Sequence, residues 1–201
     1  RGLGDVYKRQ VVCVSEDVKK SFIEMYDMAE KVGTVYNCYN DTEVVLKADM
    51  PAFDPIFSEE MTKKEPMVVA VGRLTAQKGF DRLLRAHKRL TDEGIHHRLR
   101  ILGEGEERKS LETFIKQNEL GDSAALCGFQ NNPYPMLKCA DLYVCSSLYE
   151  GFSTTVVESL ILGTPVVTTD CTGMREILGD SEYGLITAND CLLYTSPSPR
   201  D

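Results

Sequence analysis

The chain has 201 residues, with 31 Asp and Glu against 23 Lys and Arg, and a formal net charge of −8. Nucleic acids and anionic membranes are bound through clustered basic residues, so this composition argues against both as strong ligands. A hydrophobic content of 42% is typical of a globular domain, and no apolar run approaches the length of a membrane-spanning helix. The seven cysteines include no CxxC pair, which favours free thiols in a reducing, cytoplasmic compartment.

Both ends of the chain are expected to be foreign to the protein. Adapter DNA of the kind used in sequencing-library preparation can encode CLLYTSPSPRD, residues 191–201. The reverse complement of the same DNA, read in another frame, encodes RGLGDVYKRQ, residues 1–10. Because one stretch of DNA accounts for both ends, we exclude them from reasoning about the fold. We expect the natural part to be a piece of a longer protein.

The next part of the sequence predicts a short βαβ segment followed by a break. VVCVS (11–15) is typical of a strand, DVKKSFIEMY (17–26) of a helix and TVYN (34–37) of a second strand. From Asp41 to Pro66 the periodicity is lost, and this charged stretch, which contains prolines, predicts a linker.

From residue 67 onward, short apolar runs alternate regularly with amphipathic runs. This alternation indicates βαβ units, so the predicted fold class is α/β with a doubly wound parallel sheet. Ligands of such sheets bind beyond the carboxyl ends of the strands, where the loops lead into the helices. The expected strands are 67–72, 99–103, 124–129, 141–147, 165–170 and 183–186, and the expected helices are 80–90, 106–120, 135–139, 153–163 and 173–178.

The loop GRLTAQKG (72–79) follows the first strand of this series and carries Arg73 and Lys78 between two glycines. Arg can form two parallel hydrogen bonds to phosphate oxygens, and Lys adds a mobile point charge. The pair therefore suits a diphosphate, with two solvated surface cations as the alternative.

A second loop, LGEGEER (102–108), contains Gly103 and Gly105 but has Arg108 where a dinucleotide-binding fingerprint has its third glycine. A tight turn and a close approach of the backbone to a ligand remain alternative explanations for this GxG.

The segment SSLYEGFSTTVVES (146–159) is the richest in candidate functional groups. Ser153 is expected to cap a helix, and the free backbone N–H groups of such a helix start can hold an anion. Glu150 lies just before this helix, and Glu158 lies in its second turn among apolar residues. Side chains on a helix tilt toward its N-terminus, so both carboxylates can face one ligand. Sugar hydroxyls donate to carboxylates and are natural partners here.

Taken in this order and spacing, GRLTAQKG, LGEGEER, LCGF and EGFSTTVVES resemble the C-terminal half of retaining glycosyltransferases with two Rossmann-like domains, the GT-B fold of family 4 type. The resemblance extends over about residues 11–190 and is densest from 67 onward. It implies a Rossmann-like, nucleotide-sugar-binding domain at 67–190, an interdomain linker at 43–66, and the end of an N-terminal acceptor domain, a remnant of a second Rossmann-like domain, at 11–42.

The resemblance also implies roles for individual residues. Arg73 and Lys78 would hold the diphosphate of the donor, Glu150 would contact the transferred sugar, and Glu158 would accept hydrogen bonds from the ribose. The expected catalytic residues are thus Glu150, Arg73 and Lys78. The expected substrate-binding residues are Glu158, Gly151, Phe152, Ser153, Thr154, Gly103, Gly128, Phe129 and Gln130.

No cofactor or metal is expected: the resemblance implies independence from a bound metal, and the absence of an Asp-x-Asp motif in the core fits this. The implied donor is a nucleotide-sugar, with a UDP-sugar as the family's commonest choice, and the implied acceptor is a glycan or lipid-linked acceptor bound through the missing N-terminal domain. The longer parent protein could contact the inner face of the plasma membrane peripherally, and this chain alone is expected to have little or no activity.

Three other functions are alternatives to glycosyl transfer. The absent third glycine argues against a dinucleotide-dependent oxidoreductase, and the spacing of Glu150 and Glu158 behind the Arg73 and Lys78 loop favours transfer over sugar-nucleotide epimerisation. A non-catalytic nucleotide-binding domain remains the third alternative. Other conspicuous side chains are expected to be structural: His87, His96, His97, Tyr134 and Tyr143.

Overall fold

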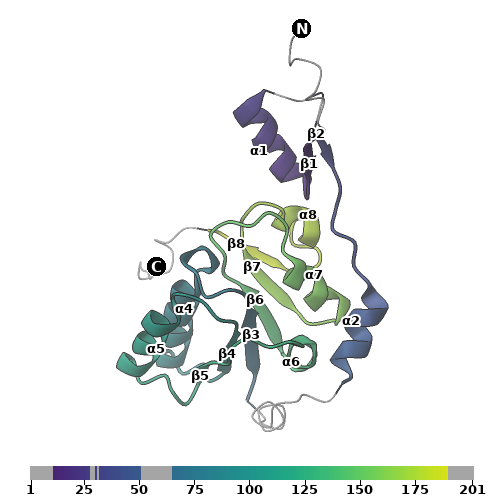
Figure 1. Ribbon diagram of the computed structural model, residues 1–201. Coiled ribbons are helices and arrows are strands. Elements are labelled where there is room, and N and C mark those ends of the chain that lie inside the picture. Colours follow the sequence, from purple (N-terminus) through teal and green to yellow (C-terminus); the bar gives the residue numbers. More distant parts are fainter. Residues whose placement is uncertain (1–10, 28–29, 31, 51–64, 190–201) are drawn as a thin grey trace.

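The computed structural model describes residues 11–27, 30, 32–50 and 65–189. The two expected foreign ends, most of the expected linker, and residue 190 lie outside the described residues. Figure 1 shows an α/β body with a smaller unit of two strands and one helix, β1, α1 and β2, beside its upper edge, and helix α2 along its side.

The body is built on a six-stranded sheet in the order β5-β4-β3-β6-β7-β8, and every pair of neighbours is parallel. The strands are β3 (Met67–Val71), β4 (Arg98–Leu102), β5 (Ala124–Leu126), β6 (Leu142–Cys145), β7 (Val166–Thr169) and β8 (Leu185–Thr187). The connecting helices are η3 (Ala76–Lys78, a 3₁₀ turn), α4 (Phe80–Asp92), α5 (Arg108–Gln117), α6 (Tyr134–Cys139), α7 (Thr154–Ile161) and α8 (Met174–Leu178).

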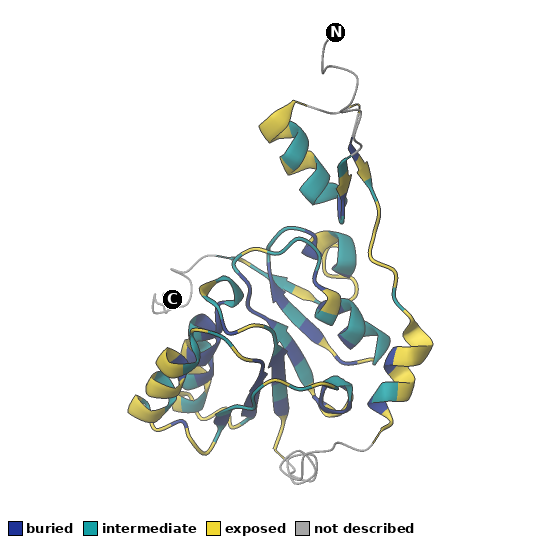
Figure 2. Ribbon diagram, in the orientation of Figure 1, coloured by how far each residue is buried: buried dark blue, intermediate teal, exposed yellow. Residues whose placement is uncertain are grey.

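Both faces of this sheet carry a hydrophobic core. Successive residues of β3 point to opposite faces, so that Met67 and Val69 join one cluster while Val68 and Ala70 join the other. Helices α6, α7 and α8 contribute to the first cluster, and α4 and α5 to the second. The inner strands are accordingly dark in Figure 2. The expected doubly wound, Rossmann-like fold is confirmed, with element ends that differ from the expected ones by a few residues.

The smaller unit consists of β1 (Val11–Cys13), α1 (Glu16–Tyr26) and β2 (Val32–Thr34), with its two strands parallel. The second strand was expected at 34–37 but begins and ends earlier. The reason is the length of its partner. The chain leaves β1 at Cys13 and enters α1 after Ser15, so that among the described residues the pairing of β2 ends with the bond from Val35 N to Cys13 O.

Helix α2 (Asp41–Ala48) corrects the expectation of an irregular linker from residue 41. The Asn40 side chain caps it by accepting from Glu43 N at 3.1 Å, a contact typical of a helix start. Its Val44 and Ala48 are buried, and the helix lies against α6 and α7. Asp41, Glu43 and Lys47 therefore lie on the outer side of a packed helix.

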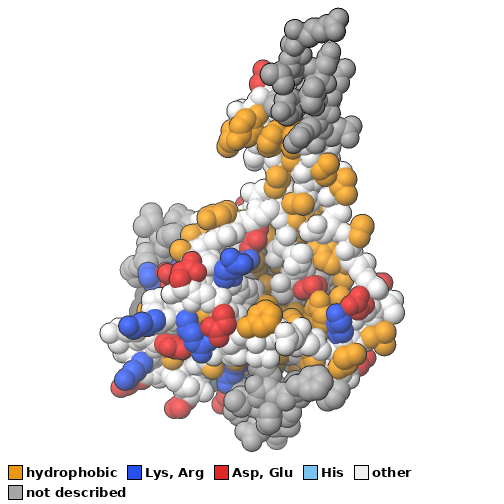
Figure 3. Space-filling view, in the orientation of Figure 1, with side chains coloured by type: hydrophobic (Ala, Val, Ile, Leu, Met, Phe, Trp, Pro, Cys, Tyr) orange, Lys and Arg blue, Asp and Glu red, His pale blue; other side chains and the backbone are white. Residues whose placement is uncertain are grey.

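Exposed apolar side chains gather on the smaller unit and near α2, while charged side chains dominate the lower left of the body (Figure 3). Met25, Tyr26, Val35 and Leu46 are among the exposed apolar residues. Within the described ranges, no helix combines the length and the apolar character needed to cross a bilayer.

Candidate functional site

The loops that follow β3, β4, β5 and β6 meet at one edge of the sheet, because the carboxyl ends of parallel strands lie side by side. Backbone hydrogen bonds join them: Gly72 N donates to Leu102 O at 2.9 Å, Gly103 N to Gly128 O at 2.8 Å, and Leu148 N, in the loop after β6, to Gln77 O at 2.8 Å. The predicted site residues of these four loops are thereby brought to one edge of the molecule.

Lys78 and Glu150 form an ion pair at the centre of this edge. The Lys78 Nζ atom lies 2.5 Å from Glu150 Oε1, and the Glu150 side chain is only 10% exposed. The Ser147 hydroxyl donates to the same carboxylate oxygen at 2.6 Å. Two candidate catalytic residues far apart in the chain are thus in direct contact, with a charge-assisted hydrogen bond between them.

Further hydrogen bonds fix the loops that carry this pair. Leu148 N donates to Gln77 O at 2.8 Å, the Gln77 amide donates to Tyr149 O at 2.9 Å, and the Ser146 hydroxyl donates to Lys78 O at 2.8 Å. Gly79 has a φ of +61°, and a Cβ there would lie 2.4 Å from Ser146 O. Glycine is therefore required where the first loop enters α4.

Glu158 points from α7 toward the start of α6. The Tyr134 hydroxyl donates to Glu158 Oε1 at 3.0 Å. Burial raises the pKa of the Glu158 carboxyl, and the Tyr134 hydrogen bond opposes that rise. The pKa of Tyr134 is raised to about 12, first by burial and then by its bond to Glu158. Tyr143 is buried and Tyr134 packs against the core, as expected, and Tyr134 in addition contacts a candidate binding residue.

A pocket of about 370 Å³ opens beside these groups. Arg73 lines it and is exposed, as is Phe129, whose side chain is 69% accessible. The Gln130 amide donates to Cys127 O at 2.9 Å, so the side chain of Gln130 is held toward its own loop. The residues lining this pocket are Val71, Gly72, Arg73, Leu102, Gly103, Glu104, Phe129, Gln130 and Pro133.

The GxG of the second loop is explained by contact between loops. A Cβ at Gly103, whose φ is +146°, would lie 1.8 Å from Gly72 O, and a Cβ at Gly105 would lie 2.3 Å from Leu74 O. Such distances exclude any side chain. The sequence left a tight turn and a close approach of the backbone to a ligand as alternatives. The structure shows a close backbone approach, and it is to the backbone of the first loop, at Gly72 and Leu74.

The loop from Glu150 to Thr154 touches the smaller unit. The Ser15 hydroxyl donates to Gly151 O at 3.1 Å, and the rings of Tyr36 and Phe152 lie 5.9 Å apart. Ser153 is the N-cap residue of α7, as expected, although its hydroxyl makes no capping bond, and Thr154 begins the helix and is exposed. Sequence reasoning missed the contacts from Ser15, Tyr36, Tyr134 and Ser147, because each depends on tertiary structure.

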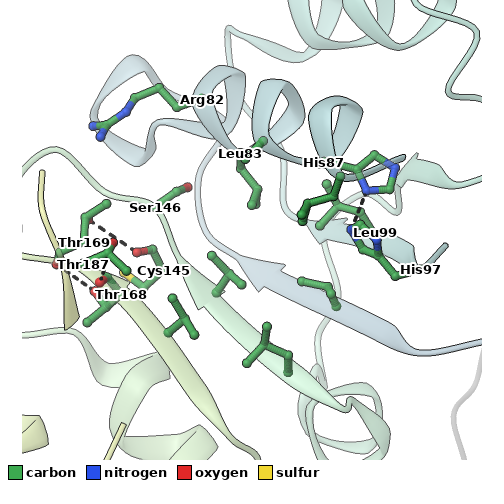
Figure 4. Close-up of a pocket in the computed structure, with 16 residues that line it drawn as sticks. Arg82, Leu83, His87, His97, Leu99, Cys145, Ser146, Thr168, Thr169 and Thr187 are labelled. Atoms are coloured by element: carbon green, nitrogen blue, oxygen red, sulfur yellow. Dashed lines mark hydrogen bonds between the residues drawn. The ribbon is translucent and has the colours of Figure 1, made fainter. Parts of the chain in front are cut away.

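A second pocket, of about 280 Å³, lies under α4 (Figure 4). Its lining is mainly apolar, from β3, β4, β6, β7 and α4, with His87 and His97 at one end and the threonines of β7 and β8 at the other. None of the predicted site residues lines it. Among the described residues, no cluster of three or more His, Cys, Asp or Glu side chains could hold a metal ion.

A parallel α/β sheet with a Lys–Glu pair, an Arg-lined pocket and a half-buried carboxylate at its carboxyl edge defines a Rossmann-like domain with a site suited to a phosphorylated, hydroxyl-bearing ligand. Residues 54–190 match the model of the family described as glycosyl transferases group 1. The chain belongs to this family.

Curated relatives agree with this assignment. The chain is 35% identical over 174 residues to an uncharacterised glycosyltransferase of Methanocaldococcus jannaschii, covering 84% of this chain and 42% of the relative. It is 38% identical over 133 residues to the N-acetylgalactosamine-N,N'-diacetylbacillosaminyl-diphospho-undecaprenol 4-alpha-N-acetylgalactosaminyltransferase of Campylobacter jejuni, covering 66% of this chain and 36% of the relative. The chain therefore spans less than half the length of these two relatives.

Solved structures of glycosyltransferases share the fold. The Anabaena protein HepE, crystallised with UDP and glucose, matches with a TM-score of 0.76 at 21% identity, over 89% of this chain and 49% of that one. A glycosyltransferase of Rickettsia africae matches with a TM-score of 0.76 at 18% identity, over 91% and 50%. These matches are consistent with the C-terminal domain of a GT-B glycosyltransferase.

Proposed function

We propose that this chain is the donor-binding part of a retaining, family 4 type glycosyltransferase of polysaccharide or glycoconjugate biosynthesis. It would bind a nucleoside diphosphate sugar, with UDP as the expected nucleotide, for transfer of the sugar to a glycan or lipid-linked acceptor. The observation that best supports this proposal is the Lys78–Glu150 pair at the carboxyl edge of the sheet, in a chain that belongs to a glycosyltransferase family.

The diphosphate would lie between the first loop and the start of α7. Lys78 is held by Glu150, so one cation is in place before a ligand arrives, and the exposed Arg73 lines the neighbouring pocket. When the bond from the sugar's anomeric carbon to the diphosphate breaks, the electron pair goes to the diphosphate. Cations positioned beforehand stabilise that charge without reorganising. Glu150 would meanwhile accept from hydroxyls of the sugar.

The nucleoside would occupy the pocket between the second and third loops. Glu158 would accept from the ribose hydroxyls, which explains why a half-buried carboxylate is kept there despite the cost of burial. The base would lie against the exposed Phe129 ring and the main chain of Gly128 and Gln130. Gly103, which lines this pocket, would border the nucleoside through its backbone.

The loop of Gly151, Phe152, Ser153 and Thr154 would contact the sugar or the phosphates through backbone N–H groups at the start of α7. Because this loop is touched by Ser15 and Tyr36 of the smaller unit, the donor would lie where the two parts of the chain meet. We further propose that the acceptor is bound mainly by residues of a longer parent protein in the cytoplasm, at the inner face of the plasma membrane, and that the present chain alone turns over little or no substrate.

Calorimetric titration of the 201-residue chain with UDP, ADP and GDP tests the donor site. We expect UDP to bind, and both Lys78→Ala and Glu158→Gln to weaken binding, the first by removing a phosphate contact and the second by removing the charged acceptor for the ribose. Circular dichroism of each variant establishes that it is folded.

Two outcomes would contradict the proposal. A folded chain that binds none of the three nucleotides lacks the proposed site, and binding that neither substitution weakens lies elsewhere on the molecule. Stronger binding of ADP or GDP than of UDP would be consistent with the proposed donor site but would show that UDP is not its preferred nucleotide.

A further inference from the structure

Tyr134 is placed to control the Glu158 carboxylate. Its hydroxyl is 3.0 Å from Glu158 Oε1, and its ring packs against the hydrophobic core beneath α6 and α7. Its backbone N–H donates to the Asn132 side chain at 3.3 Å. The phenol therefore approaches Glu158 from a fixed position at the start of α6, and it is anchored at both its ring and its backbone.

This contact leaves half of the carboxylate available. An ionised carboxylate has two oxygens, each able to accept more than one hydrogen bond. Among the described residues, Tyr134 is the one recorded donor to Glu158, and it uses Oε1. Because one oxygen is held, the plane of the carboxylate is set, and Oε2 is oriented for a donor that the described part of the chain does not supply.

The pKa of Tyr134 is raised to about 12, so its hydroxyl keeps its proton near neutral pH and can donate to Glu158. Other titratable groups also face this pair. Tyr39, in the segment before α2, and Tyr143 of β6 both have raised pKa values to which the Glu158 charge contributes. Glu43 of α2 contributes to the raised pKa of Tyr134 but is itself paired with Lys47 at 2.6 Å. Within this group, Glu158 is the carboxyl whose pKa is raised by burial.

We propose that Tyr134 is a positioning residue that holds the Glu158 carboxylate for the hydroxyl pair of a ribose, and thereby sets the preference of the site for ribonucleotides over deoxyribonucleotides. This inference rests on the proposed function, since it names how the nucleoside part of that site is recognised. The phenol has two effects: it satisfies one desolvated oxygen, and it fixes the direction of the other.

The test compares UDP with 2′,3′-dideoxy-UDP, which has the same base and phosphates but lacks both ribose hydroxyls. Hydrogen bonds to a charged group correspond to roughly 10- to 100-fold in affinity, so the unchanged protein is expected to prefer UDP by about that factor. In Tyr134→Phe, which retains the ring, the preference should fall several-fold, and in Glu158→Gln it should fall further. Tyr183→Phe, at an exposed tyrosine of the α8–β8 turn, is the matched control and should keep the full preference.

The pH dependence of this preference separates positioning from a merely structural role. The Tyr134 hydrogen bond lowers the pKa of Glu158 against the effect of burial. Without it, the carboxyl takes up its proton at higher pH, so the preference for UDP should disappear at higher pH in Tyr134→Phe than in the unchanged protein. The two nucleotides carry the same diphosphate, so protonation of the phosphates changes both affinities by the same factor. The ratio of the two affinities therefore does not depend on phosphate ionisation.

The outcomes distinguish this inference from the one on which it rests. Binding of UDP with the same preference and the same pH profile in Tyr134→Phe would overturn the role of Tyr134 and leave the donor site intact. A chain that binds neither nucleotide would overturn both. A preference lost in Glu158→Gln but kept in Tyr134→Phe would assign ribose recognition to Glu158 alone.

Discussion

The Lys78–Glu150 pair joins two loops at the carboxyl edge of the sheet. The two side chains are 23% and 10% exposed, so removing one partner leaves the other charge poorly solvated. We expect Lys78→Met to lower the free energy of unfolding by on the order of 2 kcal/mol, and the double variant Lys78→Met with Glu150→Gln to be more stable than additivity predicts. Urea unfolding of the four proteins measures this coupling.

The control for this cycle is Lys88→Met. Lys88 pairs with Asp92 at 2.6 Å on the exposed face of α4, where an ion pair contributes roughly 0.5 kcal/mol or less. If Lys78→Met costs no more than Lys88→Met, the Lys78–Glu150 contact is a surface pair and not a preformed part of the site.

Glu158 is a half-buried carboxyl whose charged form is expected to lower the stability of the folded chain. Burial raises its pKa, so in the folded state the carboxyl binds its proton more tightly than in the unfolded chain, and stability falls as the pH rises from the unfolded pKa through the folded one. Glu158→Gln should therefore have a higher Tm than the unchanged protein at pH 7, with the difference shrinking below about pH 4.5, near the ordinary carboxyl value. Differential scanning calorimetry between pH 4 and pH 7 measures this difference in Tm. A lower Tm for Glu158→Gln at pH 7 would contradict the prediction, because it would mean that the surroundings stabilise the charged carboxylate.

Helix α1 is attached to the body through its first turn. The Glu176 carboxylate accepts from Glu16 N at 3.0 Å, from Asp17 N at 2.7 Å and from the Tyr36 hydroxyl at 2.9 Å. In return, Asp17 Oδ2 accepts from Gly173 N at 3.2 Å, at the start of α8. A carboxylate at a helix start satisfies free N–H groups and complements the helix dipole.

Replacing this carboxylate should loosen the smaller unit selectively. We expect Glu176→Ala to increase amide hydrogen exchange in α1 and β2 by about tenfold, the equivalent of a contact contributing about 1.4 kcal/mol, while β3 to β7 stay protected. Glu182→Ala, at an exposed position in the following turn, should change neither. Uniform exchange changes across the sheet would instead mean that Glu176 supports the whole body.

The elements of the body were predictable because their signals are local. The apolar runs of β3 and β4 and the Phe80, Leu83, Leu84 and His87 spacing of α4 are properties of neighbouring residues. Helix α2 was missed because only Val44 and Ala48 are buried in it, and their partners in α6 and α7 lie far away in the chain. Tertiary packing gives that helix its apolar contacts, and sequence periodicity alone does not show them.

The candidate site divides in the same way. The sequence shows which residue types stand in the predicted loops and at the start of the following helix. It therefore allows four candidate site residues to be proposed: Arg73, Lys78, Glu150 and Glu158. It does not show their pairing, because Lys78 and Glu150 are 72 positions apart, and Tyr134 reaches Glu158 only through the placement of α6 beside α7. The local sequence identifies side chains whose chemistry suits a ligand. Only the fold shows which of these side chains form ion pairs or hydrogen bonds with one another.

The acid stability of the whole molecule should depend on a buried histidine outside the candidate site. His87 is 2% exposed. Its Nδ1 lies 2.8 Å from His97 Nε2, and its Nε2 lies 2.9 Å from the Ser123 hydroxyl. Burial lowers the pKa of His87 to about 4, with smaller contributions from His97 and Arg100. The folded protein therefore keeps this imidazole neutral at pH values where the unfolded chain protonates it.

Between about pH 6.5 and pH 4, the unfolded chain binds a proton at His87 that the folded chain does not, so stability falls as the pH falls through this window. The loss amounts to on the order of 3 kcal/mol at the lower end. His87→Gln should flatten this part of the pH profile of urea unfolding, although it lowers stability at pH 7 by disturbing the bonds to His97 and Ser123. His96→Gln, at the exposed neighbouring histidine, should keep the slope. An equal slope in His87→Gln and the unchanged protein would assign the acid sensitivity to the carboxylates instead.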